Sequence, residues 1–294
     1  MPSTGSGQRG GPAGEWGERV TSEVLEVLGR IAAAQRIPEA WQHAAAFFGP
    51  LGFGRLNYGL TRLRTETSVG DPADALFLST AEPEYARLYV RDGFFKRAPV
   101  YRWAVSNTGM RTWRWVHDDF AAGRLAPEEA EAVRVNARFG IFAGVSISFP
   151  DTQRTKGALG MTADIGMDHD DVDAILDRHR SAIEAVAHMM HLRIITLPAS
   201  YVRRSLTPRQ REVLEWVADG KTVQDIAMLM SISAAMVEKH LRLAREALNT
   251  ETTAQAVAKG TLLNLIFTRD APAPAPARSG MDSPTYAVEA VAAW

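Results

Sequence analysis

Histidine and acidic side chains are the first candidates for chemistry in this chain, because they can act as general bases or hold a metal ion. His188 and His191 stand three residues apart and could share one metal, but the sequence offers no third ligand. We therefore predict that both are interface or surface residues. The run 168–171, Asp-His-Asp-Asp, is predicted to start a helix, whose dipole favours carboxylates. No histidine pairs with a serine or carboxylate in a recognisable motif. We predict that the chain is not an enzyme and holds no metal.

Aromatic side chains are concentrated between residues 85 and 115. Tyr85 and Tyr89 stand four residues apart and share one helix face. The aromatics that follow are Phe94, Phe95, Tyr101, Trp103, Trp113 and Trp115. Rings with a polar tip suit a cavity that binds a small amphipathic ligand, because they offer apolar area plus a hydrogen bond. A solid aromatic core explains the same pattern, and the pattern alone favours that alternative.

Residues 206–266 predict four short helices, each with a capping residue at its start. In the run 207–210, Thr-Pro-Arg-Gln, the threonine can accept the amide proton of the glutamine, whose side chain can reach back. Gly220 ends the first helix, and the fourth is predicted to end near Ile266. The caps predicted for the later helices are Thr222, Ser233 and Thr253.

The third of these helices has two different faces. Its predicted buried stripe is Val237, Leu241, Ala244 and Leu248. Its other face carries Glu238, Lys239, Arg242, Arg245 and Glu246. Two helices joined by a tight turn at 231–233, the second with a polar outer face, form the layout that places a recognition helix in the DNA major groove. A small helical bundle with solvated charges is the alternative, and the capping signals argue against it.

This segment resembles the C-terminal DNA-binding domain of LuxR-type transcription regulators. The matching residues are Leu206-Thr207, Glu212, Leu214, Gly220-Lys221-Thr222, Ile226-Ala227, Ile232-Ser233, Val237, His240-Leu241 and Leu248. The resemblance implies that the third helix enters the major groove, that the protein binds DNA as a dimer, often through the fourth helix, and that the face 234–245 reads bases. The residues expected to contact DNA are Lys221, Thr222, Ser233, Ala235, Met236, Glu238, Lys239, Arg242 and Arg245.

The start of the recognition helix departs from the family pattern. Ala234, Ala235 and Met236 stand where the family usually has longer polar side chains, and Glu238 takes a position that is often basic. Alanine and methionine cannot donate to phosphate or guanine, although they can touch a thymine methyl group, and a carboxylate can accept from cytosine. We expect an unusual operator sequence or a modest DNA affinity.

The aromatic segment in turn resembles the autoinducer-binding domain of quorum-sensing LuxR-type regulators, over about residues 20–195. In that family a Trp, a Tyr four residues on, an Asp-Pro pair, a further Trp and a Gly line the ligand pocket. The corresponding residues here are Tyr85, Tyr89, Ala98, Pro99, Trp113 and Gly144. The resemblance implies a DNA-binding regulator controlled by a small hydrophobic signal, with an N-acyl homoserine lactone as the family's ligand.

Ala98 stands where the family's aspartate accepts the amide N–H of that lactone. An alanine side chain accepts nothing, and a buried unpaired N–H costs roughly 1–3 kcal/mol, about ten- to a hundredfold in affinity. Tyr85 can still donate through its hydroxyl in place of the family's tryptophan. Asp92, one turn beyond Tyr89, is either a substitute acceptor or a solvated carboxylate at a helix end. A regulator with a different ligand, or with none, stays an alternative.

Length and composition indicate the number of domains and the class of protein. The chain has 294 residues, 46% of them hydrophobic, and a formal charge of −1, which together predict two globular domains. Residues 203–268 carry nine Lys/Arg against seven Asp/Glu, a net charge of +2 that is mild for a DNA-binding domain. There is no cysteine, and therefore no disulfide or thiolate site. No apolar run has transmembrane length, and the N-terminus has no secretory segment, so a cytoplasmic protein is expected.

The predicted fold is α+β. An N-terminal α/β/α sandwich with a central, mostly antiparallel sheet precedes a small all-α helix-turn-helix domain of four helices. The first domain's predicted helices are 15–36, 38–48, 83–91 and 168–197, and its predicted strands are 53–63, 74–79, 144–149 and 157–163. The predicted divisions are a disordered tail 1–14, a ligand domain 15–197, a linker 198–205, a DNA-binding domain 206–268 and an Ala/Pro-rich tail 269–294. The final residues, 285–294, are apolar enough to dock as a short helix.

Two further functions are compatible with such a DNA-binding domain. A phosphorylation-controlled response regulator needs an acidic receiver domain, and no such arrangement stands before residue 120. An inhibitory relative that dimerises with an active regulator fits the weakened recognition helix. For the favoured function, the expected partners are double-stranded DNA, a small-molecule signal, a second copy of the chain in a homodimer, and RNA polymerase, with no membrane contact.

Overall fold

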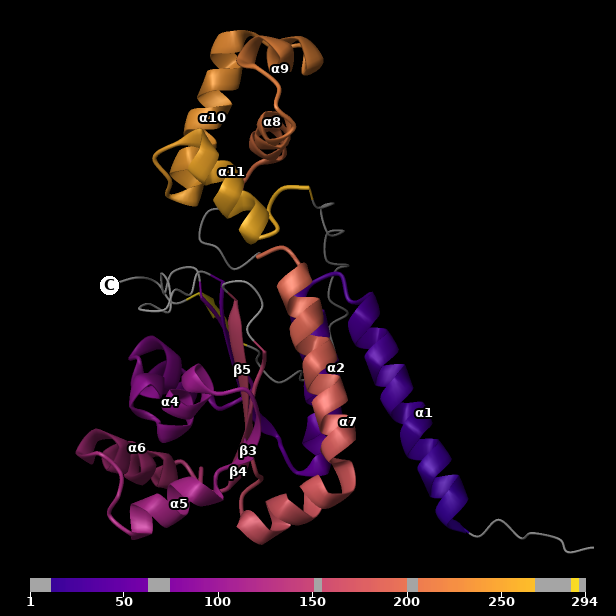
Figure 1. Cartoon of the computed structure of the whole chain (residues 1–294), viewed down its shortest axis with the longest axis vertical. Helices are drawn as coiled ribbons and strands as arrows, with labels where there is room; N and C mark the ends of the chain where they lie inside the picture. The colour runs from indigo at the N-terminus through magenta and orange to yellow at the C-terminus, as the bar shows by residue number, and fades with distance from the viewer. Residues whose placement is uncertain (1–11, 63–74, 151–154, 200–205, 268–286, 291–294) are drawn as a thin grey trace, which may run out of the picture.

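The computed structural model describes residues 12–62, 75–150, 155–199, 206–267 and 287–290. A central sheet lies between two helical layers, and a small helical domain stands at one end of them (Figure 1). One layer holds α1 (Pro12–Ala33), α2 (Ile37–Phe48) and α7 (His169–Thr196). The other holds α3 (Pro83–Ala86), η3 (Arg87–Arg91), η4 (Phe94–Arg97), α4 (Pro99–Ser106), α5 (Arg114–Ala121) and α6 (Pro127–Arg138). The predicted α/β/α sandwich is confirmed. Within the described ranges, every helix is too short or too polar to span a bilayer.

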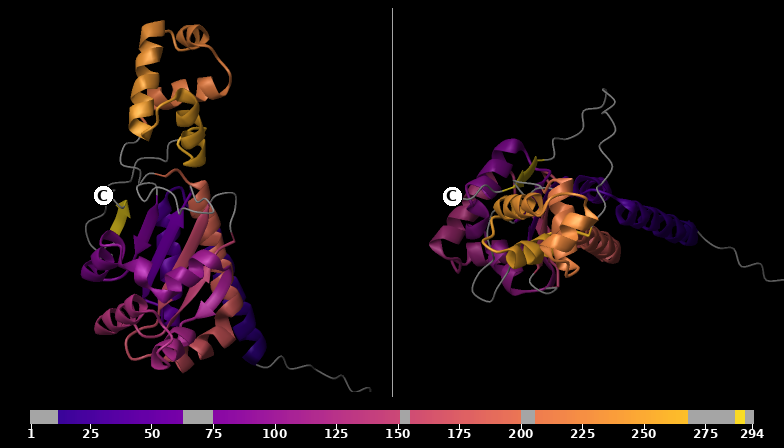
Figure 2. Two further views of the ribbon diagram at one scale, coloured as in Figure 1. Left: turned by 60° about the vertical axis from the view of Figure 1, so that its left-hand side comes forward. Right: turned by 90° about the horizontal axis from the view of Figure 1, so that it is seen from above.

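The sheet has the strand order β3-β4-β5-β1-β2-β6, and every pair is antiparallel. Its strands are β1 (Arg55–Thr61), β2 (Leu76–Ser79), β3 (Gly109–Thr112), β4 (Gly144–Ser148), β5 (Lys156–Thr162) and β6 (Ala287–Ala290). The short helix predicted for 285–294 is wrong over 287–290, where β6 pairs with β2 at the edge of the sheet (Figure 2). An unpaired edge strand offers a row of backbone N–H and C=O groups, which another strand can satisfy and a helix cannot.

The central strand β1 separates the two halves of the ligand domain. Leu56, Tyr58 and Leu60 are buried on the side of α2 and α7, and alternation sends Asn57 and Thr61 to the opposite face. Tyr58 lies against Trp41 of α2, with ring centroids 6.3 Å apart.

His191 of α7 belongs to this core. Its Nδ1 lies 2.8 Å from the Tyr58 hydroxyl, and its ring stacks on Phe149 at 4.1 Å. Only 3% of His191 is exposed, so its prediction as an interface or surface residue is wrong. The long helix that buries it was predicted, but the ring partner on β1 could not be seen from the spacing of the histidines alone. His188 is half-buried, and its Nδ1 lies 2.7 Å from the carbonyl oxygen of Glu184.

Several elements differ from the predicted ones. α1 begins at Pro12, inside the tail predicted to be disordered, while residues 1–11 lie outside the described residues. The helix predicted over 83–91 is α3 followed by the π-helical turn η3. The elements α4, β3 and α5 were not predicted, because they have eight, four and eight residues, too few for a strong hydrophobic period. α6 has twelve residues but is mostly polar and buries only Ala132, so it shows no apolar stripe.

The helical domain consists of α8 (Pro208–Ala218), α9 (Val223–Leu229), α10 (Ala234–Leu248) and α11 (Thr253–Leu262). Its caps follow the sequence closely: the hydroxyls of Thr207, Thr222 and Ser233 accept the N3 amide protons of α8, α9 and α10. The fourth cap is Thr252, not the predicted Thr253, since the side chain of Thr252 accepts from Gln255. α11 also ends before Ile266, and Asn264 beyond its end has a left-handed φ of +52°. The predicted stripe of α10 is fully buried.

Candidate ligand cavity and nucleic-acid interface

A cavity of about 740 Å³ lies between the sheet and the helices that begin with α3. Its wall combines strands β1, β2 and β5 with η3, η4 and α4. Four of the six residues expected to bind a ligand are on this wall: Tyr85, Tyr89, Ala98 and Trp113. The aromatic segment therefore encloses a void and is not a solid core. A volume of this size accommodates a small organic molecule.

The tyrosines form a continuous aromatic wall. Tyr85 and Tyr89 stack with ring centroids 5.4 Å apart, and Phe95 packs edge-on against Tyr101 at 5.0 Å. The Tyr85 hydroxyl donates to Oδ1 of Asn136 at 3.0 Å. Burial raises the pKa of Tyr85, and burial raises the pKa of Tyr89 to about 12. Both hydroxyls are therefore neutral donors at physiological pH.

Trp113 is held in place by two strands of the sheet. Its Nε1 donates to the Ser146 hydroxyl at 2.9 Å. Behind the ring, a Cβ added to Gly144 would lie 2.4 Å from the carbonyl oxygen of Met161 and 2.7 Å from the indole. Gly144 thus leaves room for Trp113 and is not on the cavity wall. Pro99 lines a separate, smaller cavity of about 60 Å³, which also touches Ala98 and Trp113.

The polar groups of the wall include residues that the sequence did not indicate. Asn136 comes from the unpredicted α6, and Lys156 comes from the start of β5. Lys156 is 8% exposed, and its Nζ donates to the carbonyl oxygens of Asn107 and Phe149 at 2.9 and 3.2 Å. Asp92 is exposed and is the only carboxylate among the described wall residues. The other polar side chains of the described wall are mainly amides and hydroxyls, and none of them is a carboxylate.

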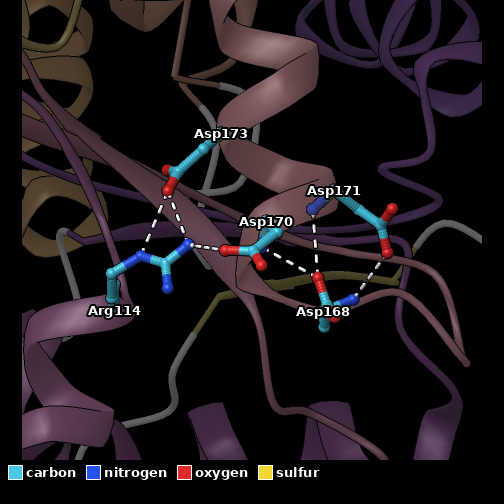
Figure 3. A network of polar contacts seen from close by, with 5 residues as sticks. All are labelled: Arg114, Asp168, Asp170, Asp171 and Asp173. Atoms are coloured by element: carbon cyan, nitrogen blue, oxygen red, sulfur yellow. Dashed lines mark hydrogen bonds and ion pairs between the residues drawn. The ribbon is translucent and has the colours of Figure 1, made fainter.

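An ion-pair network ties Arg114, the first residue of α5, to the start of the long helix α7 (Figure 3). Arg114, the residue after Trp113, donates from Nη2 to Asp170 and to Asp173, each at 2.6 Å. Asp168 caps α7, because its side chain accepts from the amides of Asp170 and Asp171. The predicted explanation of this acidic run as a helix start is confirmed. α5 is therefore held to the N-terminus of α7.

The residues expected to contact DNA lie on one part of the helical domain. All are exposed except Arg245, which is half-buried: Lys221, Thr222, Ser233, Ala235, Met236, Glu238, Lys239 and Arg242. Thr222 and Ser233 are also caps, so their hydroxyls are already engaged with backbone amides.

Three of these basic side chains have partners within the domain. Lys221 pairs with Asp219 at 3.1 Å, and Arg242 pairs with Glu246 at 2.5 Å. Arg245 donates to the Thr253 hydroxyl at 3.0 Å. The two ion pairs are exposed and therefore weak, so Lys221 and Arg242 can exchange them for phosphate or base contacts at small cost.

Comparison with known proteins agrees with both halves of the structure. Residues 37–194 match the autoinducer binding domain, and residues 204–259 match the luxR family of bacterial regulatory proteins. The chain is 23% identical to the transcriptional activator protein BjaR1 of Bradyrhizobium diazoefficiens, over 80% of this chain and 93% of that protein. It is 30% identical to the quorum sensing-dependent transcriptional regulator RpaR of Rhodopseudomonas palustris, over 61% of this chain and 70% of RpaR. A crystal structure of Escherichia coli SdiA gives a TM-score of 0.48 at 17% identity, covering 85% of this chain and all of SdiA.

Proposed function

Because this chain belongs to the LuxR family of quorum-sensing, DNA-binding transcription regulators, with an autoinducer-binding domain ahead of its helix-turn-helix domain, we propose that a small amphipathic molecule in the cavity controls its binding to DNA. The observation that carries this proposal is the cavity of about 740 Å³ beneath the neutral hydroxyls of Tyr85 and Tyr89. A ligand shifts the protein towards whichever state it binds better. Occupancy would favour the DNA-competent arrangement or the dimer.

An N-acyl homoserine lactone is the ligand class that we propose to test first. The aromatic wall supplies apolar area for its acyl chain. The Tyr85 hydroxyl and the Trp113 indole would donate to its carbonyl oxygens by exchanging their present acceptors, Asn136 and Ser146, for the ligand. Ala98 is 1% exposed and offers no side-chain acceptor for the amide N–H. That absence favours, as the second candidate, a ligand without an amide donor or a regulator that needs no ligand.

The DNA side of the proposal rests on α10. Its exposed face would enter the major groove, with Arg242 and Lys239 as donors, and Met236 against a thymine methyl group. Lys221 and Thr222 at the start of α9 would lie near phosphates. We propose that the protein acts in the cytoplasm as a homodimer on double-stranded DNA, and that it contacts RNA polymerase there. An inhibitory dimerisation partner is the alternative if α10 binds no DNA.

Replacing Ala98 with aspartate is expected to strengthen the binding of N-acyl homoserine lactones by about ten- to a hundredfold, because it supplies an acceptor for the amide N–H. The same carboxylate lacks a partner in the empty cavity, so the variant should be less stable than wild type until ligand is added. Isothermal titration of both proteins with a panel of acyl chain lengths measures the change.

Asp92→Ala, which removes the side-chain acceptor, is the matched control for this experiment. Asp92 is exposed at the cavity rim, so its loss should leave the affinity unchanged. A large loss in the control would instead make Asp92 the substitute acceptor. If neither wild type nor Ala98→Asp binds any member of the panel, this ligand class is excluded.

A further inference from the structure

Arg62 follows directly after β1 and is 2% exposed. Its guanidinium donates to three carbonyl oxygens at the end of α7: Ile194 at 3.2 Å, Ile195 at 3.1 Å and Leu197 at 3.4 Å. It also donates to the carbonyl oxygen of Leu262, the last residue of α11, at 3.1 Å. One side chain thus joins the last residues of two helices that belong to different domains.

The chemistry of this junction favours a guanidinium. The last carbonyl groups of a helix have no partner within the helix, and the helix dipole makes that end negative. Two such ends brought together need donors and positive charge. A guanidinium supplies both in a planar fork, and hydrogen bonds to a charged donor are stronger than neutral ones.

The DNA-binding domain adds contacts of its own at the same place. Asn264 donates from Nδ2 to the carbonyl oxygens of Ile195 and Leu197 at 2.7 and 3.2 Å, which also accept from Arg62. The Ala199 amide donates to the carbonyl oxygen of Leu263 at 3.0 Å. Leu197, Ala199 and Leu263 are buried.

We propose that Arg62 positions the DNA-binding domain on the ligand domain by holding the C-terminal ends of α7 and α11 together. This goes beyond the proposed function, because it needs no particular ligand. Where the proposed function also holds, this junction connects the cavity to the DNA-binding domain, since Asn57 and Thr61 of β1 lie on the cavity wall. Arg62 is the next residue after Thr61, so a ligand that displaces β1 also displaces the Arg62 guanidinium. The hydrogen bond from Arg62 to the end of α11 would then change.

The test measures the distance between the domains in the full-length chain without ligand. The sequence has no cysteine, so two introduced cysteines, Ser181→Cys on α7 and Glu251→Cys before α11, carry spin labels at unique places. Pulsed electron resonance gives the distribution of distances between them. Arg62→Met should broaden this distribution about twofold or more, because domains without a firm junction move freely. Arg62→Lys, which keeps the charge and three donors, should restore part of the narrow distribution.

Arg55→Met is the matched control. Arg55 lies at the other end of β1, is 8% exposed, and donates to the carbonyl oxygens of Phe139, Gly140 and Ala163 within the ligand domain alone. It should lower the unfolding temperature but leave the distance distribution unchanged. An Arg62→Met protein that stays folded and keeps the wild-type distribution would overturn the proposal.

Asn264→Gly tests the junction from the other side, in case Arg62→Met does not fold. Glycine accepts the left-handed backbone of Asn264 and removes only the side-chain amide, so the distribution should broaden. Asn249→Gly is its control, since Asn249 has the same φ of +52° at the end of α10 and is exposed. Equal distributions in Asn264→Gly and wild type would contradict the proposal. If the wild-type protein bound no DNA, the proposed function would be wrong, but the distances measured between the domains would still test the role of Arg62.

Discussion

Replacing Gly144 with alanine is expected to destabilise the ligand domain by about 3 kcal/mol, the upper end of the usual cost of overpacking. The added methyl group would lie 2.4 Å from the carbonyl oxygen of Met161, which belongs to the neighbouring strand and cannot rotate away. It would also lie 2.7 Å from the Trp113 ring. The indole should therefore leave its hydrogen bond to Ser146 and enter the cavity. Urea unfolding followed by circular dichroism measures the stability.

Gly160→Ala is the matched control for this prediction. Gly160 also faces Trp113, but a Cβ there would lie 3.8 Å from both the indole and the nearest backbone oxygen, which is ordinary contact. The control should lose little stability and should reduce the space in the cavity only slightly. If Gly144→Ala is as stable as Gly160→Ala, the tight packing behind Trp113 is wrong, and so is the position of the indole on the cavity wall.

The ligand domain should lose about 3 kcal/mol of stability as the pH falls from 6.5 to 4, because of His191 alone. Burial, together with the smaller effects of the positive charges of His188, Arg62 and Lys156, lowers the pKa of His191 from 6.5 to about 4. In the unfolded chain this imidazole takes up a proton near pH 6.5, whereas in the folded chain it does so only near pH 4. The contribution of the neutral imidazole is therefore complete above pH 6.5 and is lost progressively below it.

The unfolding free energy measured in urea at a series of pH values tests this expectation. His191→Gln removes the titrating group, so its stability should fall less steeply between pH 6.5 and 4 than that of wild type. His179→Gln, on the same helix and half-buried, should keep the wild-type slope. Equal slopes in all three proteins would show that His191 is not the group responsible.

The DNA-binding half was the easier part to predict, because its information is local. The hydroxyls of Thr207, Thr222 and Ser233 cap helices within three residues of themselves, so sequence spacing alone locates those helix starts. One error in this half, Thr253 in place of Thr252, arose because two adjacent threonines offer the same cap. Only the backbone conformation of the chain decides between them.

The ligand domain was harder, because its key contacts join distant segments. Tyr85 and Tyr89 are local neighbours on one helix, and their sharing of a face could be predicted. Asn136, which accepts the Tyr85 hydrogen bond, lies 51 residues away in the sequence, and no spacing pattern indicates it. Arg62 lies 200 residues from Leu262. Such pairs depend on the order of strands in the sheet, which a sequence pattern does not determine.

The central claim is that the cavity controls the recognition helix, and DNA affinity tests it most directly. The small molecule that co-purifies with the protein is identified by mass spectrometry, removed and added back. Fluorescence anisotropy then gives the affinity of the full-length chain for the DNA upstream of its own coding region, with and without that molecule. The account predicts a change of about tenfold or more, the usual size of an allosteric coupling. Equal DNA affinities of the protein with its cavity shown to be occupied and with its cavity shown to be empty would contradict the claim.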